Sequence, residues 1–324
     1  MGHNDSGADT RSGYPRMGVV LSSGGGRGVY AHTGFLMAME NLGLTVSAVA
    51  GCSAGALVGG MVASGTPLTR WVDVLSKVKK DEFWRPMFLP SFFWRMVKNK
   101  GRGISGLSDT AAGQDFCRRN LEAQTFEDCV YPFYALAIDL DGGEKIIFSK
   151  GELAPRIMAS AAIPILYQPI KIDGMYCCDG AVVDFAPTDA ICCLHNLDVV
   201  IVNHVSQSSD EKQGLEQALS QPWSMLRIID RLLYRARPWY LPEERAKSPR
   251  VSSRRCPCGC GAIIVVVEPD LPELSWPMTE GGMDIMQLAQ QQTEELLRPH
   301  KKALSEDPRG MFPRHTERGC ESLS

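Results

Sequence analysis

The sequence predicts an α/β fold, a three-layer α/β/α sandwich with a mostly parallel central sheet. Short apolar segments such as 17–21 (MGVVL) and 198–202 (DVVIV) have the composition of buried strands. Segments of helical period alternate with them along the chain. The opening order of strand, glycine-rich turn, helix, strand, sharp turn and helix is typical of the start of a parallel sheet.

The first elements follow one another with short connections. We expect a strand at 17–21, a glycine-rich turn at 22–28, a helix at 29–41, a strand at 47–50 and a helix at 54–63. The helix that begins at residue 54 is rich in small side chains.

Residues 69–125 break this pattern, and we expect them to form a helical cap. Tryptophan, phenylalanine and basic residues concentrate at 83–100 within it. Such a segment suits either a lipid-facing surface or the packed core of the cap. We favour packing, and the two roles are compatible if the cap borders a binding pocket.

The α/β pattern resumes near residue 133. Two hairpins are expected, one across Asp141-Gly142-Gly143 and one across Asp173-Gly174, because Asp-Gly and Gly-Gly pairs favour tight turns. The expected elements are strands at 134–140, 145–149, 168–172, 175–178, 198–202 and 262–267, and helices at 152–162 and 281–297.

The domain organisation follows from these elements. A single main domain is expected at 17–298. It contains an insertion at 206–261 that is helical near 223–237 and loose near 238–255. The polar segments 1–16 and 299–324 are expected to be disordered.

Composition excludes some classes of protein. The net charge of −3 gives no indication of nucleic-acid binding. No apolar run is long enough to span a bilayer, and residues 1–16 lack the apolar core of a secretory signal. Eleven cysteines, several in apolar segments, favour free thiols in a reducing cytoplasm, with peripheral membrane contact or export without a signal peptide still open.

A nucleophile-elbow pattern occupies residues 51–55. Gly51 and Gly55 flank Ser53 at the spacing that a crowded strand-to-helix turn requires. The pattern lies between a predicted strand and a predicted helix, which is the context that the chemistry needs. Cys52 is a weak alternative nucleophile, since that position of an elbow points away from the substrate.

A Ser-His-Asp triad fits the sequence poorly. None of the six histidines lies in a convincing motif, and His32 is expected to be structural. The elbow also follows only two strands, whereas an α/β-hydrolase elbow follows several.

Several segments together are similar to one family. These are Leu21–Gly28, the elbow, Ala159–Pro164 and Asp179-Gly180-Ala181, with weaker support from 139–144 and 182–187. In this order and at this spacing they resemble the patatin-like phospholipases, over roughly residues 17–205.

The resemblance implies a Ser-Asp dyad. Ser53 would attack the acyl carbon and Asp179, supported by Gly180 and Ala181, would accept its proton directly. The glycine-rich loop would supply backbone N–H groups to the oxyanion. The loop residues are Gly24, Gly25, Gly26, Arg27 and Gly28, of which we favour Gly25 and Gly26 as donors, then Gly24. Ser23 stands where relatives carry glycine, and 28–34 is one residue longer than usual.

The resemblance also implies the reaction. We expect a phospholipase A or lysophospholipase that works at a membrane or micelle surface through an acyl-serine intermediate, with no metal or organic cofactor. A transacylase using the same dyad and a non-catalytic membrane- or protein-binding relative are the alternatives. Chain-length and head-group preference and oligomeric state are not encoded in these motifs.

Three further patterns have simpler interpretations. Residues 24–28 lack the GxGxxG spacing of a dinucleotide loop, and no acidic residue ends the second strand. Asp179 on its own could merely cap a turn. Cys256, Cys258 and Cys260 could bind zinc or copper with Cys320 or a histidine as fourth ligand, but we favour a reduced loop because the usual paired spacing is missing.

Overall fold

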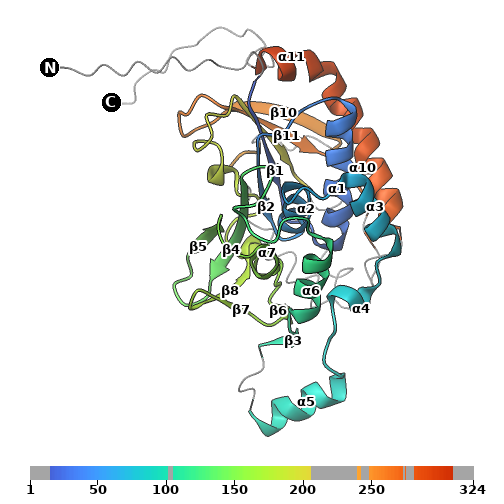
Figure 1. Ribbon diagram of the computed structural model, residues 1–324, viewed down its shortest axis with the longest axis vertical. Coiled ribbons are helices and arrows are strands. Elements are labelled where there is room, and N and C mark those ends of the chain that lie inside the picture. Colours follow the sequence, from blue (N-terminus) through green and yellow to red (C-terminus); the bar gives the residue numbers. More distant parts are fainter. Residues whose placement is uncertain are drawn as a thin grey trace, which may run out of the picture.

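The computed structural model describes residues 15–100, 105–205, 239–241, 248–272, 274 and 281–308. Its centre is a nine-stranded mixed sheet with the order β10-β11-β9-β1-β2-β4-β8-β7, in which β5 also pairs with β4 (Figure 1). The five strands from β11 to β4 are mutually parallel, and the outer pairings are antiparallel. The expected α/β class and mostly parallel sheet are confirmed.

The strands of this sheet are short and strongly apolar. Their bounds are β1 Met17–Leu21, β2 Ala48–Cys52, β4 Phe133–Asp139, β5 Lys145–Phe148, β7 Ile170–Ile172, β8 Met175–Asp179, β9 Val199–Asn203, β10 Arg250–Arg255 and β11 Ile263–Glu268. A separate two-stranded parallel pair joins β3 Gly106–Ser108 to β6 Ile165–Tyr167. All residues of β1, β2, β9 and β11 are buried, as expected for parallel strands covered on both faces.

Alternate residues of each central strand contribute to two separate cores. On β1, Val19 and Leu21 belong to the larger core, whereas Val20 belongs to the second. Helices cover the first face: α1 Gly25–Asn41, α2 Ala54–Ala63, α7 Leu153–Ser160 and α10 Gly282–Leu297 (Figure 1). Among the described residues, the segment 186–197 covers the other face.

Two expectations about the ends of the domain were wrong. Residues 250–255, expected to be loose, form β10. Their sequence, RVSSRR, is too polar to indicate a strand, but the segment pairs with β11 through antiparallel backbone hydrogen bonds. Within the tail expected to be disordered at 299–324, α11 Lys301–Glu306 is ordered and directly follows the 3-10 turn Arg298–His300, and Leu304 is fully buried against the larger core. The insertion helix expected at 223–237 and residues 1–14 and 309–324 lie outside the described residues.

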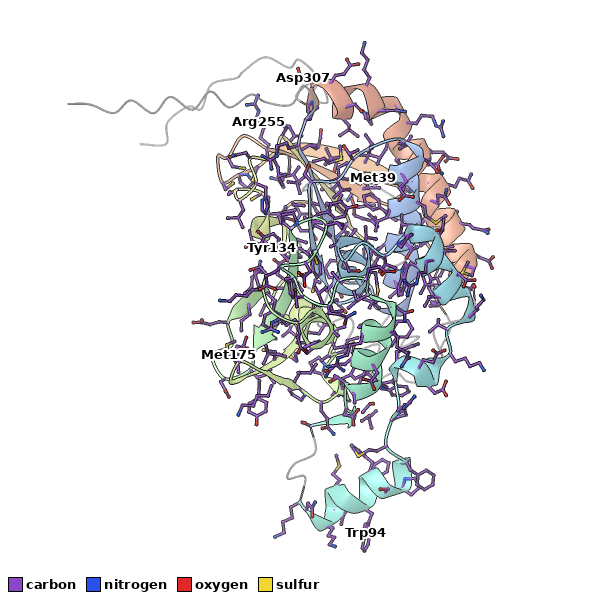
Figure 2. All side chains as sticks on the ribbon, viewed as in Figure 1. Met39, Trp94, Tyr134, Met175, Arg255 and Asp307 are labelled. Carbon is purple, nitrogen blue, oxygen red and sulfur yellow. The ribbon has the colours of Figure 1, made fainter. Side chains whose placement is uncertain are left out.

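The cap divides into packed and exposed parts. Helices α3 Leu68–Lys77, α4 Lys80–Phe83 and α6 Ala111–Asn120 pack on the body, with Trp71 fully buried. Helix α5 Leu89–Lys98 instead projects from it, and the Trp94 side chain in the middle of this helix points away from the body (Figure 2). The expectation of packing is therefore wrong for α5, because no described segment covers its rings: Phe93 is 59% exposed and Trp94 68%.

A bilayer span requires a helix of sufficient length and apolar character. Within the part of the chain that the structure describes, no helix is at once long enough and apolar enough to cross a membrane.

Candidate active site

Ser53 occupies a strained turn between β2 and α2. Its φ of 54° and ψ of −117° place it in a region that non-glycine residues rarely adopt, a cost of order 1–3 kcal/mol. A Cβ on Gly51 would lie 2.3 Å from the Gly55 carbonyl oxygen, and a Cβ on Gly55 would lie 2.1 Å from that of Leu21. Both flanking glycines are thus required by backbone contact, as the elbow pattern predicts.

The main chain of the elbow is fixed by a neighbouring serine. The N–H of Ser53 donates a 3.0 Å hydrogen bond to the Ser160 hydroxyl oxygen. The Ser160 hydroxyl in turn donates to the carbonyl of Leu136 in β4. Ser160 is fully buried at the end of α7, so this link joins the elbow to a helix and to the next strand of the sheet.

Asp179 ends β8 next to the elbow. Its carboxylate is buried, with Oδ1 accepting the N–H of Ala181 at 2.9 Å and facing the Cys52 thiol at 3.9 Å. Among the described residues, Oδ2 has no hydrogen-bond partner. Gly180 is needed at the following position, because a Cβ there would lie 2.6 Å from the carbonyl oxygen of Leu136.

Burial makes Asp179 a stronger base than an ordinary aspartate. Desolvation raises its pKa to about 6, against the smaller lowering effects of the Ser53 hydroxyl, the Ala181 N–H and the Cys52 thiol. The Ser53 hydroxyl is near enough to stabilise the carboxylate, although no hydrogen bond of normal geometry joins it to Oδ2. At neutral pH the group is mostly ionised and still able to accept a proton.

The glycine-rich loop is the first turn of α1. The helix begins at Gly25 rather than at the expected Val29, with Gly24 as its N-cap and Gly25 at a φ of +57°. The first N–H groups of a helix have no acceptor within it. A Cβ on Gly28 would lie 2.9 Å from the Cβ of Ala54, so this helix terminus rests directly on the elbow.

Arg27 makes a contact that supports the glycine-rich loop. Its guanidinium donates to the carbonyl of Leu271 at 3.4 Å, which braces the loop against the segment after β11.

The buried histidines have other partners. His32 lies between the carbonyl of Ser22 at 2.7 Å and the amide of Asn203 at 2.9 Å, and burial lowers its pKa to about 4. Burial likewise lowers the pKa of His204 to about 3, and its ring contacts the Tyr240 hydroxyl at 3.1 Å. Within the described residues, neither histidine makes a hydrogen bond to Ser53, so both remain neutral and structural.

Cys52 is a poor nucleophile in this setting. It is fully buried on the side away from the cavity, and burial beside Asp179 and Asp184 raises its pKa well above the ordinary thiol value. A thiol held protonated in this way reacts slowly.

A cavity of about 150 Å³ opens beside Ser53. Its lining includes Ser53, Ala54, Gly25 and Gly26, so the elbow and the helix terminus face one space. The remaining wall is mostly apolar and comes mainly from the cap: it includes Val29, Leu57, Trp71, Leu75, Val78, Phe83, Trp84, Phe116, Met158, Ile163 and Leu166, with Tyr30, Lys80 and Tyr167 also in the lining. Such a lining is chemically suited to a hydrocarbon chain with a polar group near the serine.

The fold and elbow together define an α/β protein with a nucleophile-elbow serine. The family model for patatin-like phospholipases matches residues 19–191, more than half of the chain. The chain therefore belongs to the patatin-like phospholipase family.

Individual relatives match over part of their length. An uncharacterised NTE family protein of Mycobacterium tuberculosis is 31% identical over 175 residues, which cover 53% of this chain and 44% of the relative. Lysophospholipase nte1 of Emericella nidulans is 26% identical over 246 residues, covering 73% of this chain and 15% of that protein. The chain thus spans less than half the length of these relatives. Human GIVD cytosolic phospholipase A2 aligns with a TM-score of 0.48 at 12% identity, over 90% of this chain and 62% of that one.

Proposed function

We propose that this protein is a lipid acyl hydrolase of the phospholipase A or lysophospholipase type. The observation that carries the proposal is one mostly apolar cavity with an elbow serine and a helix N-terminus in its lining. A buried aspartate with an elevated pKa adjoins that serine. These parts match the three needs of ester hydrolysis, which are a nucleophile, a base and an oxyanion site.

Acylation begins when Asp179 removes the proton from the Ser53 hydroxyl. The oxygen of Ser53 then attacks the ester carbonyl carbon and forms a tetrahedral oxyanion. Protonated Asp179 returns the proton to the departing alcohol, the carbon–oxygen bond breaks, and an acyl-Ser53 ester remains. Water, deprotonated by Asp179, then attacks that ester. The bond from the acyl carbon to the Ser53 oxygen breaks, protonated Asp179 returns the proton to that oxygen, and the fatty acid is released with Ser53 and Asp179 regenerated.

The oxyanion is stabilised by the start of α1. The N–H groups of Gly25 and Gly26 are the donors that we assign, since both residues line the cavity beside Ser53. The positive end of the α1 dipole adds to them. Loss of one such donor typically costs about 3 kcal/mol of transition-state stabilisation.

The substrate class is supported by two features. The cavity wall is mostly apolar and suits an acyl chain, and relatives in Emericella nidulans and Saccharomyces cerevisiae carry the name lysophospholipase. We therefore infer a phospholipid or lysophospholipid, bound with its acyl chain among the cap residues and its ester at Ser53.

Helix α5 is the surface that we assign to the lipid. Phe88, which directly precedes α5, and Val97 are each 75% exposed, and Trp94 points away from the body of the protein (Figure 2). Lys98 is the last residue of this apolar helix and Lys100 follows it, and both cations suit an anionic headgroup layer. The same cap carries Phe83 and Trp84, which line the cavity, so contact with a lipid surface would bring the acyl pocket close to its substrate.

The dyad is tested with a fluorophosphonate probe and intact-mass measurement. We expect labelling of the wild-type protein, none of Ser53→Ala and strongly slowed labelling of Asp179→Asn. Ser64→Ala is the matched control, because Ser64 is also a buried serine at an end of α2 but bonds to Met61 and Thr66. It should react like wild type. Full labelling of Asp179→Asn would contradict the assignment of the base.

Product analysis then separates hydrolysis from acyl transfer. Wild-type protein is incubated with lysophospholipid, with and without an added acceptor alcohol, and the products are identified by mass spectrometry. Free fatty acid as the main product supports the hydrolase. A transesterified lipid formed in preference to fatty acid would make the protein a transacylase that uses the same intermediate.

A further inference from the structure

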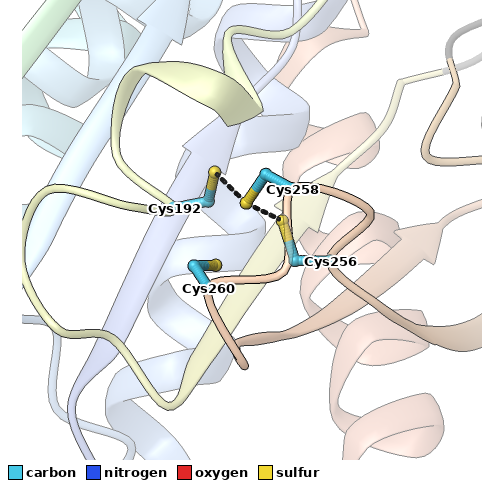
Figure 3. A group of neighbouring side chains, drawn as sticks. All are labelled: Cys192, Cys256, Cys258 and Cys260. Atoms are coloured by element: carbon cyan, nitrogen blue, oxygen red, sulfur yellow. Dashed lines mark hydrogen bonds between the residues drawn. The ribbon is translucent and has the colours of Figure 1, made fainter.

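Four cysteines from two distant parts of the chain meet outside the candidate active site. Cys192 lies in the segment that precedes β9, whereas Cys256, Cys258 and Cys260 lie in the turn between β10 and β11. Figure 3 shows their side chains directed toward one another across these two segments. All four sulfurs lie within 4.8 Å of one another.

From this geometry we propose that the protein binds one structural zinc ion through Cys192, Cys256, Cys258 and Cys260. The inference does not depend on the proposed lipid hydrolase activity, because none of these residues lines the cavity at Ser53.

The sulfur positions fit a tetrahedral centre. Zinc–sulfur bonds of about 2.3 Å in a tetrahedron place neighbouring sulfurs about 3.8 Å apart. The sulfurs of Cys192 and Cys258 are 3.8 Å apart, and those of Cys256 and Cys258 are 3.0 Å apart. All four sulfurs are therefore near the spacing that a single tetrahedral ion requires.

The turn that carries three of the proposed ligands is held in a tight conformation by its glycines and by a backbone hydrogen bond. Gly259 and Gly261 alternate with the cysteines and have φ values of +77° and +85°, which glycine adopts without strain. Nothing lies within 4 Å of a Cβ placed on either glycine, so conformation, not crowding, requires them. The N–H of Cys256 donates to the carbonyl of Ala262 at 2.9 Å and closes the turn.

The fourth ligand could not be found from sequence spacing. Three cysteines at alternate positions cannot complete a tetrahedral site alone. The fourth ligand, Cys192, lies 64 residues before Cys256 in the sequence. Sheet topology brings them together, because β9, which follows Cys192, pairs in parallel with β11, which follows Cys260. The interpretation of the turn as a plain reduced loop rested on that missing ligand.

The chemistry of the ligands favours zinc. Four thiolates with no histidine or carboxylate select a soft or borderline ion in tetrahedral geometry. A site with four protein ligands leaves no open coordination position and is structural, not catalytic. Cys193, whose sulfur is 2.9 Å from that of Cys258, is exposed and adjoins the site without being needed to complete it.

Such an ion would join the edge of the sheet to its second core. Cys192 and Cys256 are buried in the same core as Val200 and Val266, and β10 is an edge strand of the sheet. The metal would therefore hold the β10–β11 hairpin against the segment that leads from Asp179 to β9. Loss of zinc should lower thermal stability and leave the folded active site unchanged.

The test measures zinc in the full chain purified with reductant. Inductively coupled plasma mass spectrometry should find about one zinc per chain, the number that a single closed site holds. After removal of the metal by chelation, Co²⁺ alone should restore a site with the visible absorption bands of a tetrahedral cobalt–thiolate centre. Cys258→Ser and Cys260→Ser should bind either ion more than about tenfold more weakly.

Two matched controls make the result specific. Cys129→Ser removes a thiol elsewhere in the chain, and Cys193→Ser removes the adjoining thiol; both should retain the metal. Both exposed-ligand variants are checked for folding by circular dichroism, and the wild-type metal content stands even if one fails to fold. The proposal is overturned if reduced wild-type protein binds neither Zn²⁺ nor Co²⁺, if Cys258→Ser and Cys260→Ser bind zinc as wild type does, or if the cysteines hold an iron–sulfur cluster or a disulfide.

Discussion

The N–H of Ser53 donates a 3.0 Å hydrogen bond to the hydroxyl of Ser160, which itself donates to the carbonyl of Leu136. This pair sets the direction of the elbow main chain, although Ser160 does not line the cavity. Ser160 is therefore a positioning residue of the proposed site.

We expect Ser160→Ala to reduce kcat/KM about tenfold or more and to lower stability by about 1–3 kcal/mol. Two buried groups, the Ser53 N–H and the Leu136 carbonyl, would lose their partner. Steady-state hydrolysis of a soluble ester and chemical denaturation measure the two effects. Ser64→Ala serves as the control for loss of a buried hydroxyl, and an equal decrease of kcat/KM in both variants would contradict a positioning role.

Activity should rise with pH through about 6. Asp179 must be ionised to accept the Ser53 proton, and burial raises its pKa to about 6. A group with this pKa is only about one-tenth ionised at one pH unit below it, so kcat/KM near pH 5 should be about a tenth of the plateau. The profile is measured with a neutral ester and chromatographic detection of the acid. An inflection near the ordinary aspartate value, around 4, would contradict the assignment.

Asp179→Asn should make the protein more stable at neutral pH while abolishing its activity. The pKa of Asp179 is raised from 3.8 to about 6 in the folded protein, so its stabilising contribution is present below pH 4 and lost as the pH rises through 6. The folded wild type therefore carries an unfavourable buried charge at pH 8. Removing that charge should raise the free energy of unfolding by up to about 3 kcal/mol.

This stability change has its own control in the pH series. Urea denaturation of wild type and Asp179→Asn at pH 8 and at pH 4 should show the difference shrinking toward zero at the lower pH. A variant that is less stable than wild type at pH 8 would show that the carboxylate is well solvated or paired, against the burial seen here.

The exposed helix α5 should govern lipid binding without affecting chemistry. Phe93→Ser combined with Trp94→Ser should weaken binding to anionic phospholipid vesicles at least about tenfold. Both rings are exposed in the free protein, and moving an aromatic side chain from water into the lipid layer should contribute about 1.5 kcal/mol or more to binding. The kcat/KM for a soluble ester should stay unchanged. Vesicle co-sedimentation measures the binding.

Leu140→Ser is the control for α5, since Leu140 is 47% exposed on a hairpin away from the cap. It should bind vesicles like wild type. Equal vesicle binding by the double variant and wild type would exclude α5 as the lipid contact.

Much of the site could be anticipated because its constraints are local. Gly51, Gly55 and Gly180 mark places where a Cβ would collide with backbone, and such collisions act on residues that are close in sequence or in adjacent strands. The strands of the parallel centre were also readable, because burial on both faces demands continuous apolar segments. Helix α1 begins at Gly25, not at the expected Val29. Glycine has a low helix propensity, so a glycine-rich segment does not indicate a helix even where it forms the first turn of one.

What sequence left open depended on partners far along the chain. The sequence of an aromatic cluster does not distinguish packed rings from exposed ones. In this segment Trp84 is buried, whereas the rings of α5 are exposed. The polar strand β10 exists because β11 offers it a ladder.

By itself the sequence determined the α/β class, the mostly parallel sheet, the strained elbow at Ser53 and the family to which the chain belongs. Those features follow from short-range rules of periodicity and backbone sterics. Only the tertiary structure decided that Asp179 is buried enough to raise its pKa and that Cys192 joins Cys256, Cys258 and Cys260. Desolvation and ligand geometry depend on which distant segments the sheet brings together, and no local pattern records that.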